Sequence, residues 1–359
     1  MKSFYRKFSR WNFYMNSLNL KNRRRLKRSF TFIIAFVIIV LYIDRKHSRT
    51  SSLNSDYPKG DDPPVQYKMD NTHKMSAIFN MEFINPSHLM FNSFGHHFVP
   101  VIILSKAANA EVRDAIRRTW GSERIYNNTL LKSFFFVGTD DFTLQRVKME
   151  QLVFDDVIHV SIPDLYTFSA YKELAAMYWV KKYLPMAKYF IKTEDDTIIN
   201  VPTLVTKVLP HINTREQTIY GWFGKNSIIK RSPEYQKFVD ALVPPSDDLF
   251  FAVNLCYIVT AVAIDMMLET LGNIEFIEYP GDSFVTGMLR DAAKVNITSF
   301  DFNGHKYRFQ VANGKCMQVF RQDPRLLSCT TSLHAGSLRS MPEYFDAWDV
   351  IINQTNFID

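Results

Sequence analysis

The sequence predicts an α/β fold in which a mainly parallel sheet is covered by helices. Short runs of consecutive apolar residues, typical of strands buried on both faces, alternate with segments of helical periodicity. Three acids follow one of these runs directly, at Glu194–Asp196. Ligands of such sheets bind beyond the carboxyl ends of the strands. With 359 residues, the chain is long enough for one large domain with appendages.

The first predicted elements are a strand and a helix. The apolar run Phe98–Leu104 predicts a buried strand, and Glu111–Trp120 has helical spacing. Asn109 stands where a helix N-cap is expected, and Gly121 stands where the helix would end. We interpret Trp120 as a core residue.

The next segments continue the alternation. Strands are predicted at Ser133–Gly138, Asp156–Val160 and Tyr189–Lys192, and the last of these leads into the three acids. A helix is predicted over Lys172–Tyr183, with Trp179 in the core.

The second half of the chain is less regular. A helix is predicted over residues 202–209 and a short strand over Thr218–Gly221. The apolar stretch Leu249–Ile264 predicts a core strand that leads into a helix near Ile264–Leu271. Beyond Asn303 the pattern is weak.

The N-terminal region predicts a membrane anchor. Residues 1–28 hold ten Lys and Arg and no acid, and residues 29–43 carry no charge. The run is shorter than the roughly 20 residues of a typical span. A cleaved signal peptide is disfavoured because no small-residue cleavage site precedes the charged residues 44–47; a buried soluble helix is the other alternative. By the positive-inside rule, the body of the chain lies in a lumen.

These features divide the chain into four parts. We expect a cytoplasmic tail at 1–28, a transmembrane signal anchor at 29–43, a polar stem or linker at 44–95 and a lumenal catalytic domain at 96–359. Outside the tail, 33 basic residues face 36 acidic ones, so the net charge of +7 comes from the tail. The body is not basic, and no nucleic-acid partner is predicted.

A lumenal body would permit glycosylation and one disulfide. The sequence contains three N-x-Ser/Thr triplets, which begin at Asn127, Asn296 and Asn353. Among the three cysteines, Cys316 and Cys329 are the nearer pair in sequence, whereas Cys256 lies in an apolar stretch and is interpreted as buried.

The acids Glu194, Asp195 and Asp196 are the strongest functional signal. Adjacent carboxylates repel one another, and a divalent cation would relieve that repulsion. Mg²⁺ and Mn²⁺ prefer carboxylate oxygens and keep positions open for phosphate. The turn therefore predicts a site for a metal ion and, through it, a diphosphate. The alternative is a solvated acidic turn.

Five segments in order resemble the signature segments of β-1,3-galactosyltransferase-like enzymes. Arg113–Gly121 resembles their R-x-x-I-R-x-T-W-G, and Lys192–Asn200 resembles their K-x-D-D-D-x-F-V-N. The other three segments are Phe135–Gly138, Asp164–Trp179 (D-x-Y…K…W) and Tyr279–Gly287, which falls where they carry E-D-V-x-x-G. The agreement covers roughly residues 98–290.

The resemblance implies a GT-A glycosyltransferase fold, with a Rossmann-like sheet and flanking helices. It also implies a UDP-sugar donor, Mn²⁺ (or Mg²⁺) and inversion at the sugar. The acceptor would be a glycan, glycoprotein or glycolipid. With the predicted anchor, we expect a single-pass type II protein of the Golgi membrane whose catalytic domain is lumenal.

The resemblance also implies roles for the metal and base residues. Asp196 matches the family's metal-binding Asp, and Asp195 and Glu194 would orient ligands or waters around the metal. Asp282 is the candidate base that takes the proton of the acceptor hydroxyl. A structural alternative is that Asp282 caps the helix over residues 283–289.

Three cations are candidates for binding the donor. Arg113 and Arg117 lie on one helix face, where they would pair with diphosphate oxygens, brace the uridine pocket or form a solvated basic face. Lys172 is either a helix-surface cation or a partner of the acidic site.

Several positions depart from the family pattern. Glu194 replaces an Asp and Gly281 replaces the Glu of the Glu-Asp pair. Phe168 stands in place of an Asn, and Leu184 in place of a cysteine. The segment Asn254–Tyr257 replaces a glycine-rich acceptor-side motif. These changes indicate a divergent member of the family.

Three functions are weighed. The first is an inverting hexosyltransferase that moves galactose or N-acetylhexosamine from a UDP-sugar, in β-1,3 linkage. The second is a catalytically weakened lumenal protein of the same fold that binds sugar nucleotides or carbohydrates. The third is a metal-dependent phosphohydrolase, which the scattered histidines disfavour.

Overall fold

The computed structural model describes residues 75–84, 96–126, 128–225, 250–271, 281–312, 314–333 and 337–355. All of them belong to one compact unit, Met69–Asp359. The predicted tail at 1–28 and the predicted anchor at 29–43 lie outside the described residues. Within the described ranges, no helix combines the length and the apolar character that crossing a membrane requires.

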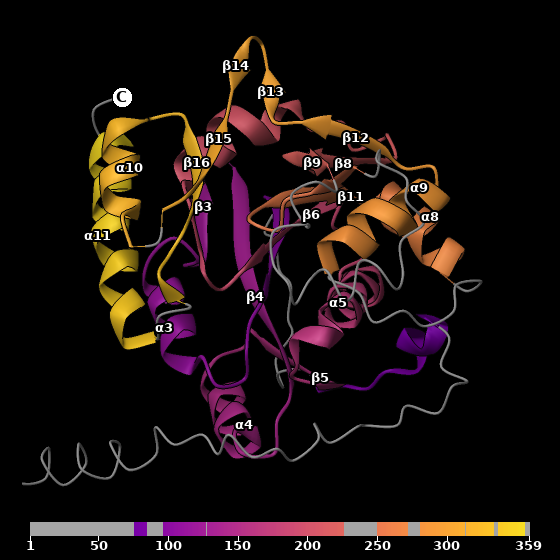
Figure 1. Ribbon diagram of the computed structural model, residues 1–359. Coiled ribbons are helices and arrows are strands. Elements are labelled where there is room, and N and C mark those ends of the chain that lie inside the picture. The colour runs from indigo at the N-terminus through magenta and orange to yellow at the C-terminus, as the bar shows by residue number, and fades with distance from the viewer. Residues whose placement is uncertain are drawn as a thin grey trace, which may run out of the picture. The chain divides into compact units, whose positions relative to one another are not determined.

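A nine-stranded sheet forms the centre of the unit (Figure 1). Its strands lie in the order β1-β5-β4-β2-β6-β11-β8-β12, and β3 pairs with β4. The bounds of these strands are β1 (Phe83–Ile84), β2 (His97–Leu104), β3 (Arg124–Tyr126), β4 (Thr129–Thr139), β5 (Val157–Pro163), β6 (Tyr189–Glu194), β8 (Thr218–Gly221), β11 (Tyr257–Thr260) and β12 (Asn296–Ser299).

The sheet is mixed rather than mainly parallel, which corrects the prediction. The strands β5, β4, β2 and β6 run parallel, as expected from the strand-helix alternation. However, β11 lies antiparallel between β6 and β8. The strand-helix alternation breaks there, because β10 and a turn rather than a helix precede β11.

Helices cover both faces of the sheet. They are η1 (Met75–Asn80), α3 (Ala110–Arg118), α4 (Leu144–Val153), η2 (Tyr166–Phe168), α5 (Ser169–Tyr183), α6 (Val201–Thr203), η3 (Leu204–Val208), η4 (Leu209–His211), α8 (Ala261–Leu271), η6 (Asp282–Leu289), α9 (Arg290–Ala292), α10 (Cys316–Gln322) and α11 (Ser337–Thr355). Residues of β2 alternate between two cores: Val101 and Ile103 pack with α3, whereas Ile102 packs with α5. The central strands are rich in apolar residues because both faces of the sheet are buried.

The domain begins before the predicted boundary at residue 96. Strand β1 pairs antiparallel with β5, and Ile78 is fully buried in the core beside α5. Residues 75–84, which the sequence assigned to the stem, are thus part of the folded unit.

Most predicted elements are confirmed, with shifted ends. The sequence missed α4 altogether, and α8 begins three residues before the predicted Ile264. The helix predicted over residues 202–209 is divided into the α-helical turn α6, the π-helical turn η3 and the 3₁₀ turn η4. Trp120 and Trp179 are both core residues, as predicted.

Three small sheets accompany the central sheet in the described residues, and two of them include strands of the C-terminal region, where the pattern was weak. The sheet that bears on the site has the order β15-β16-β7, formed by β15 (Arg308–Val311), β16 (Leu326–Thr330) and β7 (Thr197–Ile199). The others pair β9 (Phe223–Lys225) with β10 (Phe250–Ala252) and β13 (Asp301–Phe302) with β14 (His305–Lys306). A disulfide joins Cys316 to Cys329, and Cys256 is a buried free thiol whose pKa is raised to about 12 by burial.

Helix α11 runs alongside α3 on one face of the central sheet (Figure 1). Strand β16 pairs with β7, which follows the acidic turn directly. The last part of the chain is therefore brought back to the residues that the sequence analysis singled out.

Candidate active site

The three acids lie at a point in the sheet where two neighbouring strands, β2 and β6, have chain connections that run in different directions. Strand β2 leads through α3 to β4 on one side, whereas its other neighbour, β6, arrives from α5. The carboxyl ends of β2 and β6 meet, and Asp195 N donates to Leu104 O over 3.1 Å. Crevices at such points are the usual ligand sites of open α/β sheets.

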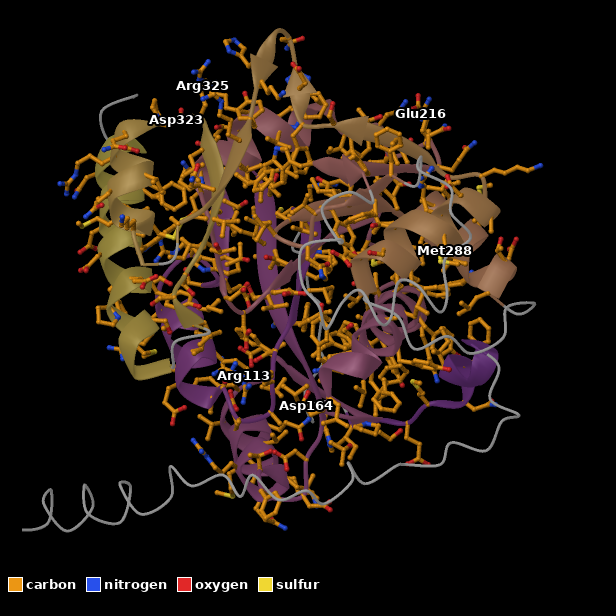
Figure 2. All side chains as sticks on the ribbon, in the orientation of Figure 1. Arg113, Asp164, Glu216, Met288, Asp323 and Arg325 are labelled. Atoms are coloured by element: carbon orange, nitrogen blue, oxygen red, sulfur yellow. A yellow bond between two sulfur atoms is a disulfide. The ribbon has the colours of Figure 1, made fainter. Side chains whose placement is uncertain are left out.

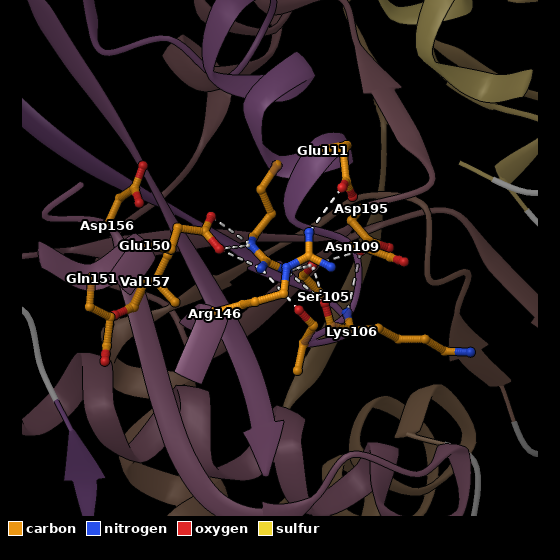
Figure 3. Close-up of polar contacts among 12 residues, drawn as sticks. Ser105, Lys106, Asn109, Glu111, Arg146, Glu150, Gln151, Asp156, Val157 and Asp195 are labelled. Carbon is orange, nitrogen blue, oxygen red and sulfur yellow. Dashed lines mark hydrogen bonds and ion pairs between the residues drawn. The ribbon is translucent and has the colours of Figure 1, made fainter. Parts of the chain in front are cut away.

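Asp195 is held by the loop that follows β2. Its Oδ2 accepts hydrogen bonds from Ser105 Oγ at 2.7 Å, Asn109 Nδ2 at 2.9 Å and Lys106 N at 3.4 Å (Figure 3). Burial raises the pKa of Asp195, and the bonds from Asn109 and Ser105 oppose that rise only in part. The side chain is placed to orient the turn.

Asn109 therefore has a different task from the predicted one. It occupies the N-cap position of α3, but its side chain makes no capping hydrogen bond. The amide reaches across to Asp195 instead. The polar residue in front of the helix is used to join two strand ends.

The C-terminal region holds the acidic turn from the opposite side. Thr331 N donates to Asp196 O over 2.7 Å, and Tyr344 Oη of α11 donates to Asp195 O. The Asp196 side chain is buried, and its Oδ1 accepts from Thr197 Oγ1 at 3.0 Å. The backbone of the turn is fixed by segments more than a hundred residues away in sequence.

Glu194 brings unfavourable negative charge to the site. A third of its side chain (34%) remains exposed, and its Oε1 lies 3.3 Å from Lys192 Nζ. Burial raises the pKa of Glu194 to about 7. The negative charges of Asp196, Asp282 and Asp195 also raise this pKa, whereas the positive charge of Lys192 lowers it. The predicted base and the predicted metal-binding acids thus share one electrostatic site.

Asp282 is the first residue of η6, and Gly281, not Asp282, occupies the N-cap position. The Asp282 side chain is half-buried, and its Oδ1 accepts from Ser283 N at 2.8 Å. Burial raises the pKa of Asp282, and the bonds from Ser283 and the charge of Lys192 offset part of the rise. A carboxylate with a raised pKa is a better proton acceptor.

Arg113 is turned into the protein interior. It is fully buried, and Nε, Nη1 and Nη2 all donate to protein acceptors. These acceptors are Glu150, Ser105 Oγ and the carbonyls of Lys106 and Ala107. The predicted alternative of a solvated basic face is wrong for Arg113, which is buried, whereas pairing with diphosphate oxygens and bracing of a uridine pocket stay predictions.

Arg117 belongs to the same ion-pair network. Its Nη2 lies 2.8 Å from Glu150 Oε1, and its Nε lies 2.7 Å from Asp156 Oδ2. Although burial alone would lower it, these carboxylates raise the pKa of Arg117. Arg117 therefore supports the loop after β2 only indirectly, through Glu150.

Lys172 and Asp164 hold the same loop from α5 and the end of β5. Lys172 Nζ lies 2.5 Å from Asp164 Oδ1 and donates to Ser105 O over 3.1 Å. Asp164 Oδ2 accepts from Ala107 N at 2.6 Å. Arg113 and Asp164 thus approach one short loop from two sides (Figure 2). Lys172 is buried, so the helix-surface alternative is wrong; its ion pair is with Asp164, and its role toward the acidic site stays a prediction.

The predicted glycosylation sites lie away from these residues. Asn296 is exposed on β12 at the edge of the sheet, and Asn353 is exposed on α11. Asn127 lies outside the described residues. Glycosylation at all three positions stays a prediction.

The side chains that the structure brings together at the acidic turn bear on the predicted metal site. In the part of the chain that the structure describes, no group of three or more His, Cys, Asp or Glu is arranged to hold a metal ion. Asp195 points to Ser105 and Asn109, and Glu194 points to Lys192. The all-oxygen donor set suits Mg²⁺ or Mn²⁺, which bind through one or two carboxylates together with substrate phosphates.

The sequence analysis missed several residues that build the site. Ser105, Tyr344 and Glu173 had no role assigned, and Asp164 was noted only as part of a motif. Asp164 and Lys172, eight residues apart in the D-x-Y…K segment, gave a signal that they act as a pair. Tyr344 gave none, because its contact depends on the path of the C-terminal region.

Comparison with protein families gives one match that covers more than half of the chain. The galactosyltransferase family model matches residues 111–301. This range contains the acidic turn, Asp282, Arg113 and its partner Glu150, whereas the loop residues Ser105, Lys106 and Ala107 precede it.

Curated relatives are similar at modest identity. UDP-GalNAc:beta-1,3-N-acetylgalactosaminyltransferase 1 of Homo sapiens is 26% identical over 211 residues, which is 56% of this chain and 61% of that protein. Beta-1,3-galactosyltransferase 4 of Mus musculus is 30% identical over 135 residues, covering 37% of this chain and 36% of that protein. Beta-1,3-galactosyltransferase 1 of Mus musculus is 28% identical and covers 48% and 54%. The match thus spans about three fifths, or less, of these relatives' length.

Among solved structures, the apo form of mouse xyloside xylosyltransferase 1 aligns with 65% of this chain and 97% of that chain. The sequence identity is 10% and the TM-score is 0.33, a likeness too slight to inform the fold.

Proposed function

Since the chain belongs to the galactosyltransferase family, we propose that it is an inverting hexosyltransferase with a GT-A fold. It moves galactose or N-acetylhexosamine from a UDP-sugar to a glycan, glycoprotein or glycolipid acceptor in β-1,3 linkage. The observation that carries the proposal is the acidic turn Glu194–Asp196, whose Asp195 N donates to Leu104 O where the carboxyl ends of β2 and β6 meet.

Asp196 is the proposed protein ligand of a divalent cation on the donor diphosphate. A bound Mn²⁺ or Mg²⁺ would offset the charge that develops on the leaving nucleotide. Asp195 keeps the turn in place through Ser105 and Asn109. Arg113, Lys172 and Asp164 hold the loop that presents Ser105.

Asp282 is the proposed base. The acceptor hydroxyl attacks the anomeric carbon while its proton passes to the Asp282 carboxylate. The bond between the anomeric carbon and the diphosphate oxygen breaks, and its electron pair leaves with UDP. A single displacement of this kind inverts the sugar. The positive charge of Lys192 lowers the pKa of Asp282 and so favours the ionised carboxylate that a base requires.

The proposed setting is the Golgi membrane, with residues 29–43 as the anchor of a type II protein. The exposed positions of Asn296 and Asn353 and the disulfide between Cys316 and Cys329 support a lumenal body.

The test is UDP release with Mn²⁺ across a panel of UDP-sugars and acceptors, measured together with donor binding. Asp196→Ala is expected to abolish donor binding. Asp282→Asn is expected to keep donor binding within about threefold while transfer falls by roughly 10²–10⁴-fold, the usual range for loss of a general base. Asp301→Asn, an exposed acid on β13, is the matched control.

A second function is favoured by the ion pair between Glu194 and Lys192. This pair ties up a carboxylate of the acidic turn, as expected of a protein that binds a sugar nucleotide but has weak turnover. Donor binding without transfer to any acceptor of the panel supports this alternative. Donor binding that survives both EDTA and Asp196→Ala contradicts the metal assignment.

A further inference from the structure

Glu173 on α5 is a buried carboxylate to which the proposed function gives no role. Its exposed fraction is 1%. Oε1 accepts a hydrogen bond from Tyr257 Oη, and Oε2 lies 3.5 Å from Lys192 Nζ. Lys192 and Tyr257 are register partners on β6 and β11. We call Glu173, Lys192 and Tyr257 the Glu173 cluster.

Stability alone is a weak reason for this cluster. Buried ion pairs often add little net stability relative to apolar side chains of similar volume, because both ions lose their hydration. Burial raises the pKa of Glu173, in spite of the opposing charge of Lys192 and the bond from Tyr257. A reason other than stability is therefore needed for a carboxylate at this buried position.

The cluster reaches the acidic turn on one side. Lys192 Nζ lies 3.3 Å from Glu194 Oε1 and 2.5 Å from Asn254 Oδ1. The ammonium group therefore links Glu173 to the first acid of the turn. Its ring contact with Tyr257, at 5.4 Å from the centroid, fixes it further.

The cluster reaches the proposed base on the other side. A Cβ atom added to Gly281 would lie 2.8 Å from Glu173 Oε2, so the Gly281 backbone packs directly against the carboxylate. The backbone of Gly281 has φ −54° and ψ −47°, which any residue adopts. A side chain at position 281 would meet Glu173 Oε2 unless the Glu173 side chain moved, so the constraint here is on space rather than on conformation. Gly281 N also donates to Ser169 Oγ of α5 over 3.2 Å.

We propose that Glu173 is a positioning residue for the transfer reaction: from α5 it supplies the carboxylate that Gly281 lacks, and it fixes Asp282 relative to Glu194 through its contacts with Gly281 and Lys192. This inference rests on the proposed function. It accounts for the departure at Gly281, because a side chain at position 281 would meet the Glu173 carboxylate where it now lies.

The test is a reciprocal exchange in the full chain. Glu173→Gln keeps the shape but removes the charge, and we expect kcat to fall about 10–100-fold, the range usual for supporting shells. Donor binding, measured by calorimetry with Mn²⁺, should change less than about threefold because Asp196 is untouched. Gly281→Glu alone should lower kcat as strongly, because two carboxylates then compete for one space.

The double variant Glu173→Ala, Gly281→Glu decides the proposal. It moves the carboxylate from α5 to position 281, and we expect kcat to recover to within about threefold of wild type, since contacting substitutions are non-additive. Wild-type kcat in Glu173→Gln overturns the proposal. A double variant no better than the worse single variant overturns it too.

A thermal unfolding cycle separates this inference from the proposed function. Gly281→Ala should lower the Tm of the wild-type chain but not that of Glu173→Ala, because the clash with Oε2 is then gone. This measurement needs no turnover. An inactive wild-type chain would refute the proposed function, whereas the cycle would still decide whether Gly281 and Glu173 are coupled. Equal Tm losses in both backgrounds overturn the coupling.

Discussion

Arg113 illustrates how a residue of a family signature can serve a site from the protein interior. Its guanidinium is enclosed by Glu150, Ser105 and the carbonyls of the loop after β2. Through Ser105 it reaches Asp195. A change at this arginine would therefore disturb the acidic turn through the loop, and it would also leave Glu150 buried with one partner fewer.

The first prediction concerns Glu150, the shared partner of Arg113 and Arg117. Glu150→Gln removes the charge that two buried arginines need, and we expect a loss of about 3–5 kcal/mol in the free energy of unfolding. Glu111→Gln is the matched control, because its partner Arg146 is exposed and the loss should stay below about 1 kcal/mol. Denaturant unfolding measures both, and equal losses would contradict the prediction.

The same glutamate sets a pH dependence. Burial would raise the pKa of Glu150, but the hydrogen bonds and charges of Arg113 and Arg117 outweigh it and lower the pKa below the usual 4.5. A lowered carboxylate pKa stabilises the fold above the unfolded-state pKa, and this contribution is lost as the pH falls through the folded-state value. The stability gap between wild type and Glu150→Gln should thus shrink below about pH 4.5. A gap that widens in acid would contradict the assignment.

The predictability of single residues depended on whether their partners are near in sequence. Asp164 and Lys172 pair within one segment and carried a detectable spacing. Asn109 looked like a helix cap, since Asn is favoured there, and its real partner Asp195 lies 86 residues away. Glu173 sits in a helix that is buried almost all round, so periodicity gave no face for it.

Among the secondary-structure elements, the β15-β16-β7 sheet and its disulfide hold the turn from the C-terminal side. Strand β16 pairs with β7 directly after the acids, and Cys329 of β16 is joined to Cys316 of α10. The crosslink therefore restrains a strand whose only role near the site is support.

The first element-level prediction follows from that crosslink. The double variant Cys316→Ser, Cys329→Ser opens a loop of 13 residues, and we expect the free energy of unfolding to fall by about 3 kcal/mol. Cys256→Ala serves as the control because Cys256 is free. Thermal unfolding with and without reductant checks the result. If reductant changes the variant as much as wild type, the effect does not come from this bond.

Helix α11 supports the turn through one hydroxyl. Tyr344→Phe removes the donor to Asp195 O and leaves a buried carbonyl without that partner, so we expect a loss of about 1–3 kcal/mol and weaker donor binding. Tyr178→Phe, whose ring packs on η1, is the control. Donor affinity equal to wild type in Tyr344→Phe would show that the turn does not need α11.

The sequence predicted those elements whose pattern is strong. The strands β2, β4, β5 and β6 are continuous apolar runs, and all four were found. Helix α4 was missed because exposed Met149, Leu152 and Val153 blur its amphipathic spacing. Strands β7, β15 and β16 have three to five residues each and derive their order from long-range pairing, which a short window does not contain.

For the chain as a whole, the prediction that remains untested is its membrane topology. Residues 29–43 are expected to anchor the full chain, and removal of residues 1–43 should release it from membranes after carbonate extraction. If the body is lumenal, Asn296→Gln and Asn353→Gln should each remove one glycosidase-sensitive gel shift. An alanine in place of the exposed Asn303 is the control, since it begins no triplet.

The support of the acidic turn by Thr331 and Tyr344 has a genetic consequence. A nonsense mutation after residue 301 would leave the whole matched family region translated, and a reading based on motifs would score the allele as intact. The protein would nevertheless lack the segments that clamp the turn. Late truncating alleles should therefore behave as null, and a nearly full-length open reading frame is a poor guide to function in this chain.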